Sequence, residues 1–186
     1  MPFIKTEFPG LLIFEPVIFE DSRGYFYESY NEKTFEHEGI SIKFVQDNQA
    51  KSSYGVIRGM HYQLAPHAQT KLVRVLSGSI LDVAVDIRKG SPTFGKVYSL
   101  ELSSENKKQL LIPKGFAHGY SVLSETAEVF YKCDAFYNKE SEAGILLNDE
   151  KLNIDWQVPF SKTIISEKDK QYPLFEDCKN NFVFEG

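Results

Sequence analysis

Hydrophobic and polar residues alternate with a period of two along much of the chain, which is the pattern of half-buried β-strands. In residues 81–88, Leu81, Val83, Val85 and Ile87 fall on one face, and the residues between them fall on the other. Residues 71–85 predict two strands joined by a tight turn at residues 77–79. The remaining predicted strands cover residues 11–19, 24–30, 52–63, 95–103, 109–115, 117–124 and 127–137.

Helical signals are few and short. Residues 31–39 begin with Asn31 as a possible N-cap and end with Gly39 as a possible stop. Residues 166–169, "SEKD", resemble a capping box with a short acid at its last position. Many short strands separated by turns predict an all-β, cupin-type jelly roll with a few short peripheral helices. The 186 residues contain no repeat or linker, so a single domain over residues 1–186 is expected.

Composition narrows the classes of function. Hydrophobic residues make up 42% and charged residues 25% of the chain, as in soluble globular proteins. The net charge of -5 argues against a nucleic-acid binder, but it allows a local cationic pocket for one anionic ligand. The chain has no signal-peptide pattern and no apolar run near ~18 residues, so we expect a cytoplasmic protein that does not bind membranes. With only Cys133 and Cys178, a disulfide scaffold is not expected.

The histidines do not form the pattern of a metal site. Cupin barrels often bind a metal through a His-x-His pair, but Gln63 stands two residues after His61. The other histidines are His37, His67 and His118, and none of them completes such a pair. The ligand count therefore predicts no metal, although a metal-dependent cupin stays an open alternative.

Three side chains on the predicted strands could carry proton transfer. His61 is the residue type whose charge changes near neutral pH, so it can act as a general base. Lys71, one strand away, could stabilise an oxyanion, and the phenol of Tyr131 could donate a proton. Each has an ordinary alternative, because histidines are often structural, lysines are usually solvated and strand tyrosines usually pack.

Two arginines point to an anion. Arg23 and Arg58 each precede a glycine, where the backbone leaves room for a ligand, and guanidinium groups bind phosphate bidentately. A surface salt bridge is the alternative for each. On a regular strand Arg58 and His61 point to opposite faces, so a bulge at Gly59 would be needed to bring them together. By the same parity Tyr131 and Tyr137 would share a face.

Five sequence stretches, in order, resemble the dTDP-4-dehydrorhamnose 3,5-epimerase family, over about residues 14–173. They are "DSRGYFYESYN", "FVQDNQAKSSYGVIRGMHYQ", "KLVRVLSGSILDVAVDIRKGSPTFGK", "IPKGFAHGYSVLSETAEVFYKC" and "ISEKDKQYP". The resemblance implies a cupin-type jelly roll, a homodimer and catalysis without metal or organic cofactor. It implies the substrate dTDP-4-dehydro-6-deoxy-D-glucose, whose C4 ketone acidifies the hydrogens at C3 and C5.

The resemblance also assigns roles to residues. His61 matches the general base, Asp169 its carboxylate partner, Tyr131 the general acid and Lys71 the residue that stabilises the enolate. Tyr137 matches the ring that stacks on thymine. The other matched substrate-contacting positions are Arg23, Glu28, Gln46, Asp47, Asn48, Arg58, His118, Glu142 and Lys168.

Some alternatives stay open within this resemblance. Phe136 and Lys139 stand where many members have Tyr and Pro, which makes the loop near Glu142 less certain. Asp169 has the spacing of a helix-capping acid as well as the match to the catalytic carboxylate. An epimerase acting at only C3 or C5, or on another nucleotide sugar, is a close alternative. A jelly roll that binds a sugar or nucleotide without catalysis is another.

Overall fold

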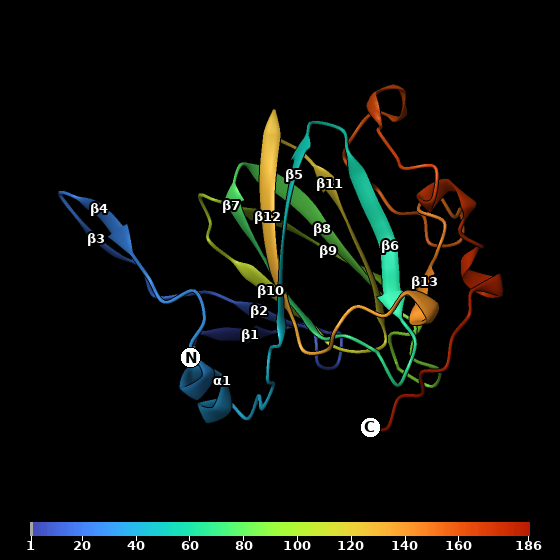
Figure 1. Cartoon of the computed structure of the whole chain (residues 1–186), viewed down its shortest axis with the longest axis horizontal. Helices are drawn as coiled ribbons and strands as arrows, with labels where there is room; N and C mark the ends of the chain where they lie inside the picture. The colour runs from blue at the N-terminus through green and yellow to red at the C-terminus, as the bar shows by residue number, and fades with distance from the viewer. Residues whose placement is uncertain (1) are drawn as a thin grey trace.

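Two antiparallel β-sheets lie face to face in the computed structural model, which describes residues 2–186 (Figure 1). The six-stranded sheet has the order β1 (Phe3–Lys5), β2 (Leu12–Phe14), β10 (Gln109–Ile112), β7 (Lys71–Ser77), β12 (Thr126–Cys133) and β5 (Gln46–Ser53). The five-stranded sheet has the order β13 (Glu142–Gly144), β6 (Ile57–Gln63), β11 (Phe116–Val122), β8 (Ser79–Asp86) and β9 (Val97–Ser103). This arrangement confirms the predicted all-β jelly roll.

The apolar side chains form three layers. One cluster, which includes Val73, Val129 and Ile80, fills the space between the sheets. A second covers the outer face of the five-stranded sheet with the C-terminal segment, where Trp156 and Phe175 pack against the strands. The third covers the outer face of the six-stranded sheet. Because the five-stranded sheet is covered on both of its faces, β8 is buried along nearly its whole length, including its two aspartates.

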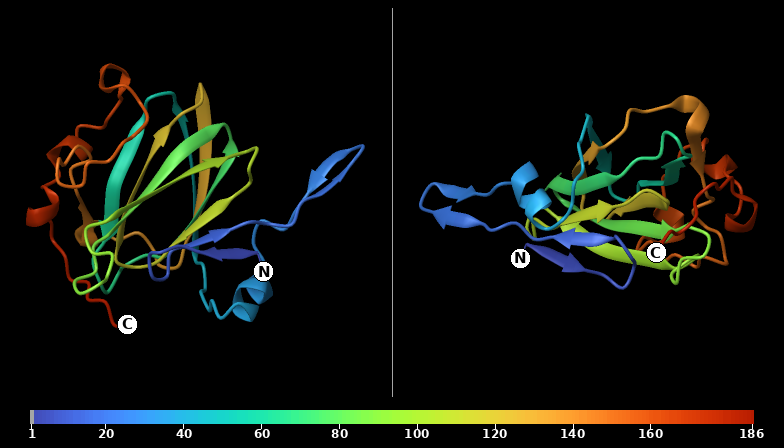
Figure 2. Two further views of the ribbon diagram at one scale, coloured as in Figure 1. Left: turned by 180° about the vertical axis from the view of Figure 1, so that it is seen from behind. Right: turned by 90° about the horizontal axis from the view of Figure 1, so that it is seen from below.

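The segment that follows β13 wraps around the five-stranded sheet and returns beside β6 (Figures 1 and 2). The indole nitrogen of Trp156 donates to the carbonyl of Leu147 at 2.8 Å, and a β-bridge joins Lys89 to Val183. The segment contains three short 3-10 helices: η2 (Phe160–Lys162), η3 (Asp169–Gln171) and η4 (Phe175–Asp177). Of these, η3 contacts β6, which brings Asp169 to the inner part of the molecule.

The predicted helix at residues 31–39 is confirmed as α1 (Glu32–His37). The side chain of Asn31 accepts a hydrogen bond from the backbone N–H of Lys33 at 3.1 Å, and Gly39 ends the helix with a φ of +79°. Phe35 is buried against Phe14, with ring centroids 5.3 Å apart. None of the helices within residues 2–186 is both long and apolar enough to cross a bilayer.

Several predicted strands are shorter than their patterns indicated. The run 11–19 is broken around Pro16, which cannot donate to a sheet, and the run 24–30 is a strand only in β4 (Gly24–Phe26). β12 ends at Cys133, so Tyr137 lies in a loop, and the prediction that it shares a strand face with Tyr131 is wrong.

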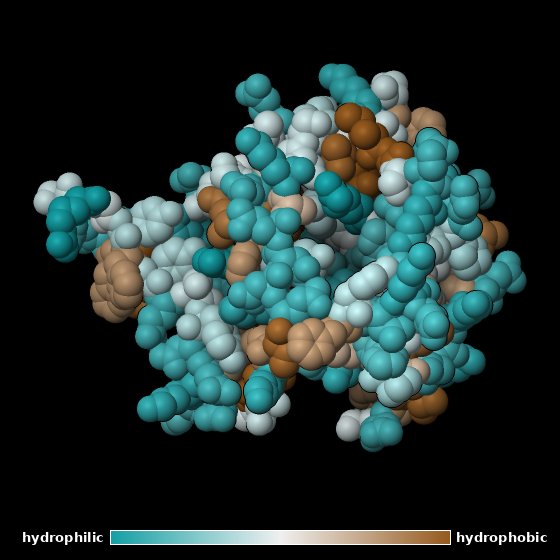
Figure 3. All heavy atoms as spheres, viewed as in Figure 1, coloured by the Kyte–Doolittle hydropathy of each residue, from teal (hydrophilic) through white to brown (hydrophobic). Residues whose placement is uncertain are grey.

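A two-stranded hairpin of β3 (Phe19–Asp21) and β4 projects away from the two sheets, at the left of Figure 1. It pairs with neither sheet, and both views of Figure 2 show it extended from the body. Phe19, Tyr25 and Phe26 are exposed on it, and hydrophobic atoms are visible on this arm in Figure 3. An isolated hairpin with exposed aromatic rings is only marginally stable in water by itself.

The pairing of β6 with β11 shifts register at Gly59. His61 pairs with His118 and Arg58 pairs with Tyr120, so β6 carries one residue more than its partner across this interval. Paired residues share a face, and His118 and Tyr120 are two positions apart on β11. Arg58 and His61 therefore point to the same inner face, through the kind of bulge that the sequence allowed at Gly59.

We predict that Gly59→Ala lowers the free energy of unfolding by about 2–4 kcal/mol. Gly59 has a φ of +145°, and a Cβ there would lie 2.6 Å from the Cα of Gly119. Urea denaturation followed by circular dichroism measures the effect. Gly39→Ala is the control, because Gly39 has a φ of +79° but open space around it. It should cost only about 1 kcal/mol. Equal losses for the two variants would contradict a contribution from the close approach of β6 and β11.

Candidate active site

A cavity of about 350 Å³ opens between the two sheets. The side chains that line it come from β5, β6, β7, β12 and β13 and from the loops next to them. They are Gln46, Asn48, His61, Tyr62, Gln63, Gln69, Lys71, Tyr131, Tyr137 and Glu142. The structure thus brings together the predicted base, acid and enolate-stabilising lysine with four of the predicted binding residues.

His61 and Asp169 form a hydrogen-bonded pair at the cavity. Nε2 of His61 lies 2.8 Å from Oδ1 of Asp169, and the side chains are 33% and 5% exposed, respectively. Burial opposes ionisation of Asp169, but the hydrogen bond and charge of His61 outweigh it, so the pKa of Asp169 lies below its ordinary value. The carboxylate therefore stays ionised and orients the imidazole.

Asp169 also has the local geometry that the "SEKD" pattern predicted, but only in part. Its backbone N–H donates to the hydroxyl of Ser166 at 3.1 Å, which is the serine half of a capping box. Its carboxylate instead binds His61 and lies 3.5 Å from the backbone nitrogen of Gly59. The cap and the histidine partner are thus served by different atoms of Asp169.

Tyr131 and Lys71 lie on the wall opposite His61, because they belong to the six-stranded sheet and His61 belongs to the five-stranded one. Burial raises the pKa of Tyr131 to about 12, so its phenol is protonated at neutral pH. Burial lowers the pKa of Lys71, against the attraction of Cys133, Asp82 and Glu142. Nζ of Lys71 lies 5.9 Å from the centre of the Tyr131 ring. The cavity thus has a histidine–carboxylate pair on one wall and a phenol with an ammonium group on the other.

A second histidine–aspartate pair lies next to the first, because His118 on β11 is the strand-pairing partner of His61 on β6. Nε2 of His118 is 2.7 Å from Oδ1 of Asp82, and both side chains are buried. Burial lowers the pKa of His118 despite the nearby Asp82. Asp82 was not among the predicted site residues. The sequence feature that could have indicated it is its position on β8, where a carboxylate alternates with apolar residues in a strand that is buried on both faces.

Glu142 links two other predicted binding residues, Tyr137 and Lys168, at the edge of the cavity. Its Oε2 accepts from the hydroxyl of Tyr137 at 3.0 Å and lies 2.5 Å from Nζ of Lys168. Burial opposes the charge of Glu142, but the bonds from Lys168 and Tyr137 lower its pKa below the ordinary value. The backbone N–H of Tyr137 donates to Gln46 at 2.9 Å, and Gln46 donates to Asn48 at 3.0 Å. Five predicted binding residues therefore form one connected group.

The other predicted residues have different surroundings. Arg58, on the inner face of β6, donates to the hydroxyl of Ser52 at 3.1 Å. Asp47 points to the outer face of β5, where it pairs with Lys132 at 3.0 Å, and it does not line the cavity.

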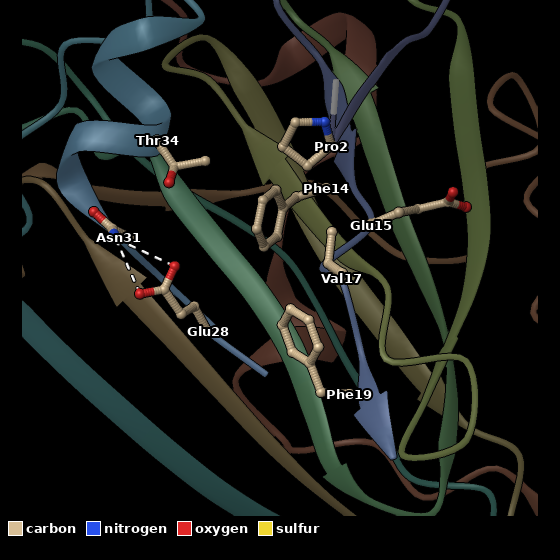
Figure 4. Close-up of a pocket in the computed structure, with 8 residues that line it drawn as sticks. All are labelled: Pro2, Phe14, Glu15, Val17, Phe19, Glu28, Asn31 and Thr34. Atoms are coloured by element: carbon tan, nitrogen blue, oxygen red, sulfur yellow. Dashed lines mark hydrogen bonds between the residues drawn. The ribbon is translucent and has the colours of Figure 1, made fainter. Parts of the chain in front are cut away.

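Arg23 and Glu28 lie apart from the cavity. Arg23, in the turn of the projecting hairpin, is 87% exposed and contacts Asp21. Glu28 accepts from Asn31 and lines a separate cavity of about 510 Å³ between the hairpin stem and α1, together with Phe14 and Phe19 (Figure 4).

Within residues 2–186 no three His, Cys, Asp or Glu side chains lie close enough together to hold a metal ion. Gln63, at the position of the second cupin histidine, donates to the carbonyls of His67 and Phe136 at 2.6 and 3.2 Å. The groups at this cavity are thus suited to proton transfer and to hydrogen bonding of a polar ligand.

Comparison with known proteins gives consistent matches. A family model described as dTDP-4-dehydrorhamnose 3,5-epimerase matches residues 5–177. A dTDP-4-dehydrorhamnose 3,5-epimerase of Shigella flexneri is 55% identical over 96% of this chain and 98% of its own length. The crystal structure of the enzyme with that name from Elizabethkingia anophelis NUHP1 has a TM-score of 0.90 and 57% identity, covering 94% of this chain and 96% of that chain. A Legionella pneumophila Philadelphia 1 epimerase in complex with dTDP-4-keto-L-rhamnose has a TM-score of 0.90 and 49% identity, covering 94% and 93% of the two chains.

We predict that Asp169→Asn destabilises the fold most at neutral pH. Because the pKa of Asp169 is lower in the native protein than its ordinary 3.8, its ionised form stabilises the fold above that pH. This contribution is lost as the pH falls through the native pKa. Urea denaturation between pH 7 and pH 3 should show the difference between wild type and variant shrinking in acid. Exposed Glu105, changed to Gln, is the control. A difference that stays constant or grows in acid would contradict the prediction.

Proposed function

The chain belongs to the dTDP-4-dehydrorhamnose 3,5-epimerase family, and we propose that it converts dTDP-4-dehydro-6-deoxy-D-glucose into dTDP-4-dehydro-L-rhamnose. The observation that carries this proposal is the position of the His61–Asp169 pair and of Tyr131 on facing sheets of one cavity. A sugar ring held between these walls meets a base on one face and an acid on the other. Inversion at carbon needs this opposed arrangement.

His61 acts as the base in the proposed mechanism. The C4 ketone acidifies the C–H bonds at C3 and C5, and the imidazole removes a proton from one of these carbons. Asp169, ionised and 2.8 Å from Nε2, stabilises the imidazolium that forms. The electron pair of the broken C–H bond moves into the enolate, whose charge lies on the C4 oxygen.

Lys71 stabilises that oxygen, and Tyr131 completes the inversion. A half-buried ammonium interacts with an oxyanion more strongly than a fully solvated one, because water screens it less. The enolate carbon takes a proton from the Tyr131 phenol on the face opposite the base, and the phenolate then recovers a proton from solvent. The imidazolium of His61 releases its proton to solvent, and a second cycle at the other carbon then uses the same groups. The mechanism requires neither a metal ion nor an organic cofactor.

The remaining residues bind the nucleotide part of the substrate. The ring of Tyr137, 55% exposed, stacks on the thymine base, and Arg58 and Lys168 interact with the diphosphate. Gln46, Asn48 and Glu142 line the cavity and supply hydrogen bonds along it. His118 is buried against Asp82 and pairs with His61 across β6 and β11. The two free cysteines, Cys133 and Cys178, suit the reducing cytoplasm in which we expect the enzyme to act.

We propose further that the enzyme is a homodimer in which the projecting hairpin reaches the partner's cavity. Support comes from the exposed aromatic rings of the hairpin, which an interface would bury, and from the exposed guanidinium of Arg23 at its turn. In this arrangement Arg23 binds the diphosphate held by the other protomer. Glu28, near the stem of the same hairpin, belongs to the interface.

We predict that incubation of the keto sugar with the enzyme in D2O places deuterium at both C3 and C5, as measured by NMR and mass spectrometry. His61→Ala should slow exchange at both carbons by about 10²–10⁴-fold, since general-base catalysis is lost. Tyr131→Phe should still exchange protons on the His61 face while failing to invert the centres. Deuterium at one carbon only would indicate a single-centre epimerase, and no exchange at all would contradict catalysis.

We predict that mixing Arg23→Gln and His61→Ala proteins restores activity. A mixed dimer then has one cavity with both an intact His61 and an intact Arg23 from the partner. With random reassociation, activity should reach about one quarter of the wild-type value. Mixing is achieved by denaturing and refolding the two variants together, and the unmixed variants are the controls. Mixtures no more active than the separate variants would show that Arg23 does not act across a dimer.

A further inference from the structure

The loop that carries Tyr137 continues from the end of β12 without sheet pairing. Cys133 is the last residue of the strand, and η1 (Lys139–Ser141) begins only after Asn138. Within residues 2–186, Ala135, Phe136 and Tyr137 form no hydrogen bond with another backbone group. A loop of this kind would sample many conformations unless side chains hold its peptide groups.

Three glutamine carboxamides supply those bonds. Gln69 donates to the carbonyl of Ala135 at 2.8 Å, and Gln46 accepts from the N–H of Tyr137 at 2.9 Å. Gln63 donates to the carbonyl of Phe136 at 3.2 Å and accepts from the N–H of Asn138 at 2.7 Å. The three glutamines come from β5, β6 and the segment before β7, so they fix the loop to both sheets.

Gln63 is the centre of this set. It is only 5% exposed, and its nitrogen also donates to the carbonyl of His67 at 2.6 Å. Its nitrogen faces two carbonyls and its oxygen faces an N–H, so a flipped carboxamide would lose all three bonds. Glutamate could accept from Asn138 but not donate to the carbonyls, and leucine could do neither. The residue at the second-histidine position of a metal-binding cupin thus joins β6 to the loop.

The ring of Tyr137 is held at both ends as a result. Its backbone is bound through Gln46 and, on the adjacent peptides, through Gln63, and its hydroxyl donates to Glu142 at 3.0 Å. The ring itself is 55% exposed and lines the cavity. An aromatic face that is fixed but uncovered is ready to receive a flat ligand without an ordering cost.

We propose that Gln63, assisted by Gln46 and Gln69, is a positioning residue that preorganises Tyr137 for the pyrimidine base of a nucleoside diphosphate. This inference rests on the proposed function, because that function assigns the base to Tyr137. Gln63 acts through the loop and takes no part in proton transfer. Its loss therefore weakens nucleotide binding more than it slows the chemical step.

The test compares Gln63→Leu and Gln63→Glu with wild type, using calorimetric titration with dTDP and steady-state kinetics with the keto sugar. The Kd for dTDP and the KM should rise about tenfold, with kcat changed less than about twofold. Gln69→Ala, at a partly exposed position with a single bond to the loop, should raise the Kd in the same direction by about threefold. It keeps the test decisive if the Gln63 variants fold poorly. Gln49→Leu is the matched control, because Gln49 lies on β5 three residues from Gln46, on the outer face, and donates to Glu128.

A double-mutant cycle distinguishes positioning from a general structural role. Gln63→Leu should add little to the loss caused by Tyr137→Ala, since both remove the same contact. Fully additive losses, an unchanged Kd, or a fall in kcat with constant KM would each overturn the inference while leaving the epimerase function intact. Failure of the wild type itself to bind dTDP and exchange deuterium would instead overturn the proposed function, and this inference with it.

Discussion

The bond between His61 and Asp169 joins residues 108 positions apart in the chain, and the site depends on it. It forms only because the C-terminal segment covers the outer face of the five-stranded sheet and returns beside β6. The apolar contacts of Trp156, Phe175 and Phe182 with that sheet hold the segment in place. Hydrophobic burial on the outside of the jelly roll therefore orients an imidazole on the inside. Removing the covering layer would expose apolar strands and separate the histidine from its carboxylate at the same time.

The polar and charged side chains between the sheets lower the stability of the fold, because they lose contact with water. Asp82 and His118 are buried and Lys71 is half-buried, and an isolated buried charge is strongly unfavourable. The fold offsets this cost by pairing His118 with Asp82 and by keeping Lys71 near several acidic groups. One oxygen of Asp82 still has no hydrogen-bond partner within the described residues. Weak solvation of this region is useful at a reacting centre. A cation that water screens only weakly, such as Lys71, stabilises developing negative charge more effectively.

The architecture could be predicted from the period-two pattern, since each sheet face is either buried against the other sheet or covered outside. Most of β5 was not predicted by this pattern, because its inward positions, such as Gln46 and Asn48, are polar where an ordinary strand would be apolar. The end of β12 at Cys133 has no strong sequence signal, so the parity argument for Tyr137 failed. Local spacing cannot bring Asp169 to His61, because a long covering segment lies between them. That pairing was anticipated only through the resemblance to a family.

The distribution of charge explains how an acidic chain can hold an anionic ligand. Within residues 2–186, eight of the 21 lysines and arginines form an ion pair with a carboxylate, as Lys168 does with Glu142 and Lys132 does with Asp47. Within residues 2–186, Arg58 and Lys71 are among the cations that form no ion pair with a carboxylate, and they belong to the two facing sheets. Lys71 lines the cavity, and Arg58 lies on the inner face of β6 with an exposed side chain. The bulge at Gly59 places Arg58 on the same face of β6 as His61, so a single backbone irregularity adds positive charge to the wall that carries His61. Under the proposed function, these two cations offset the net negative charge of the chain at the place where the anionic substrate binds.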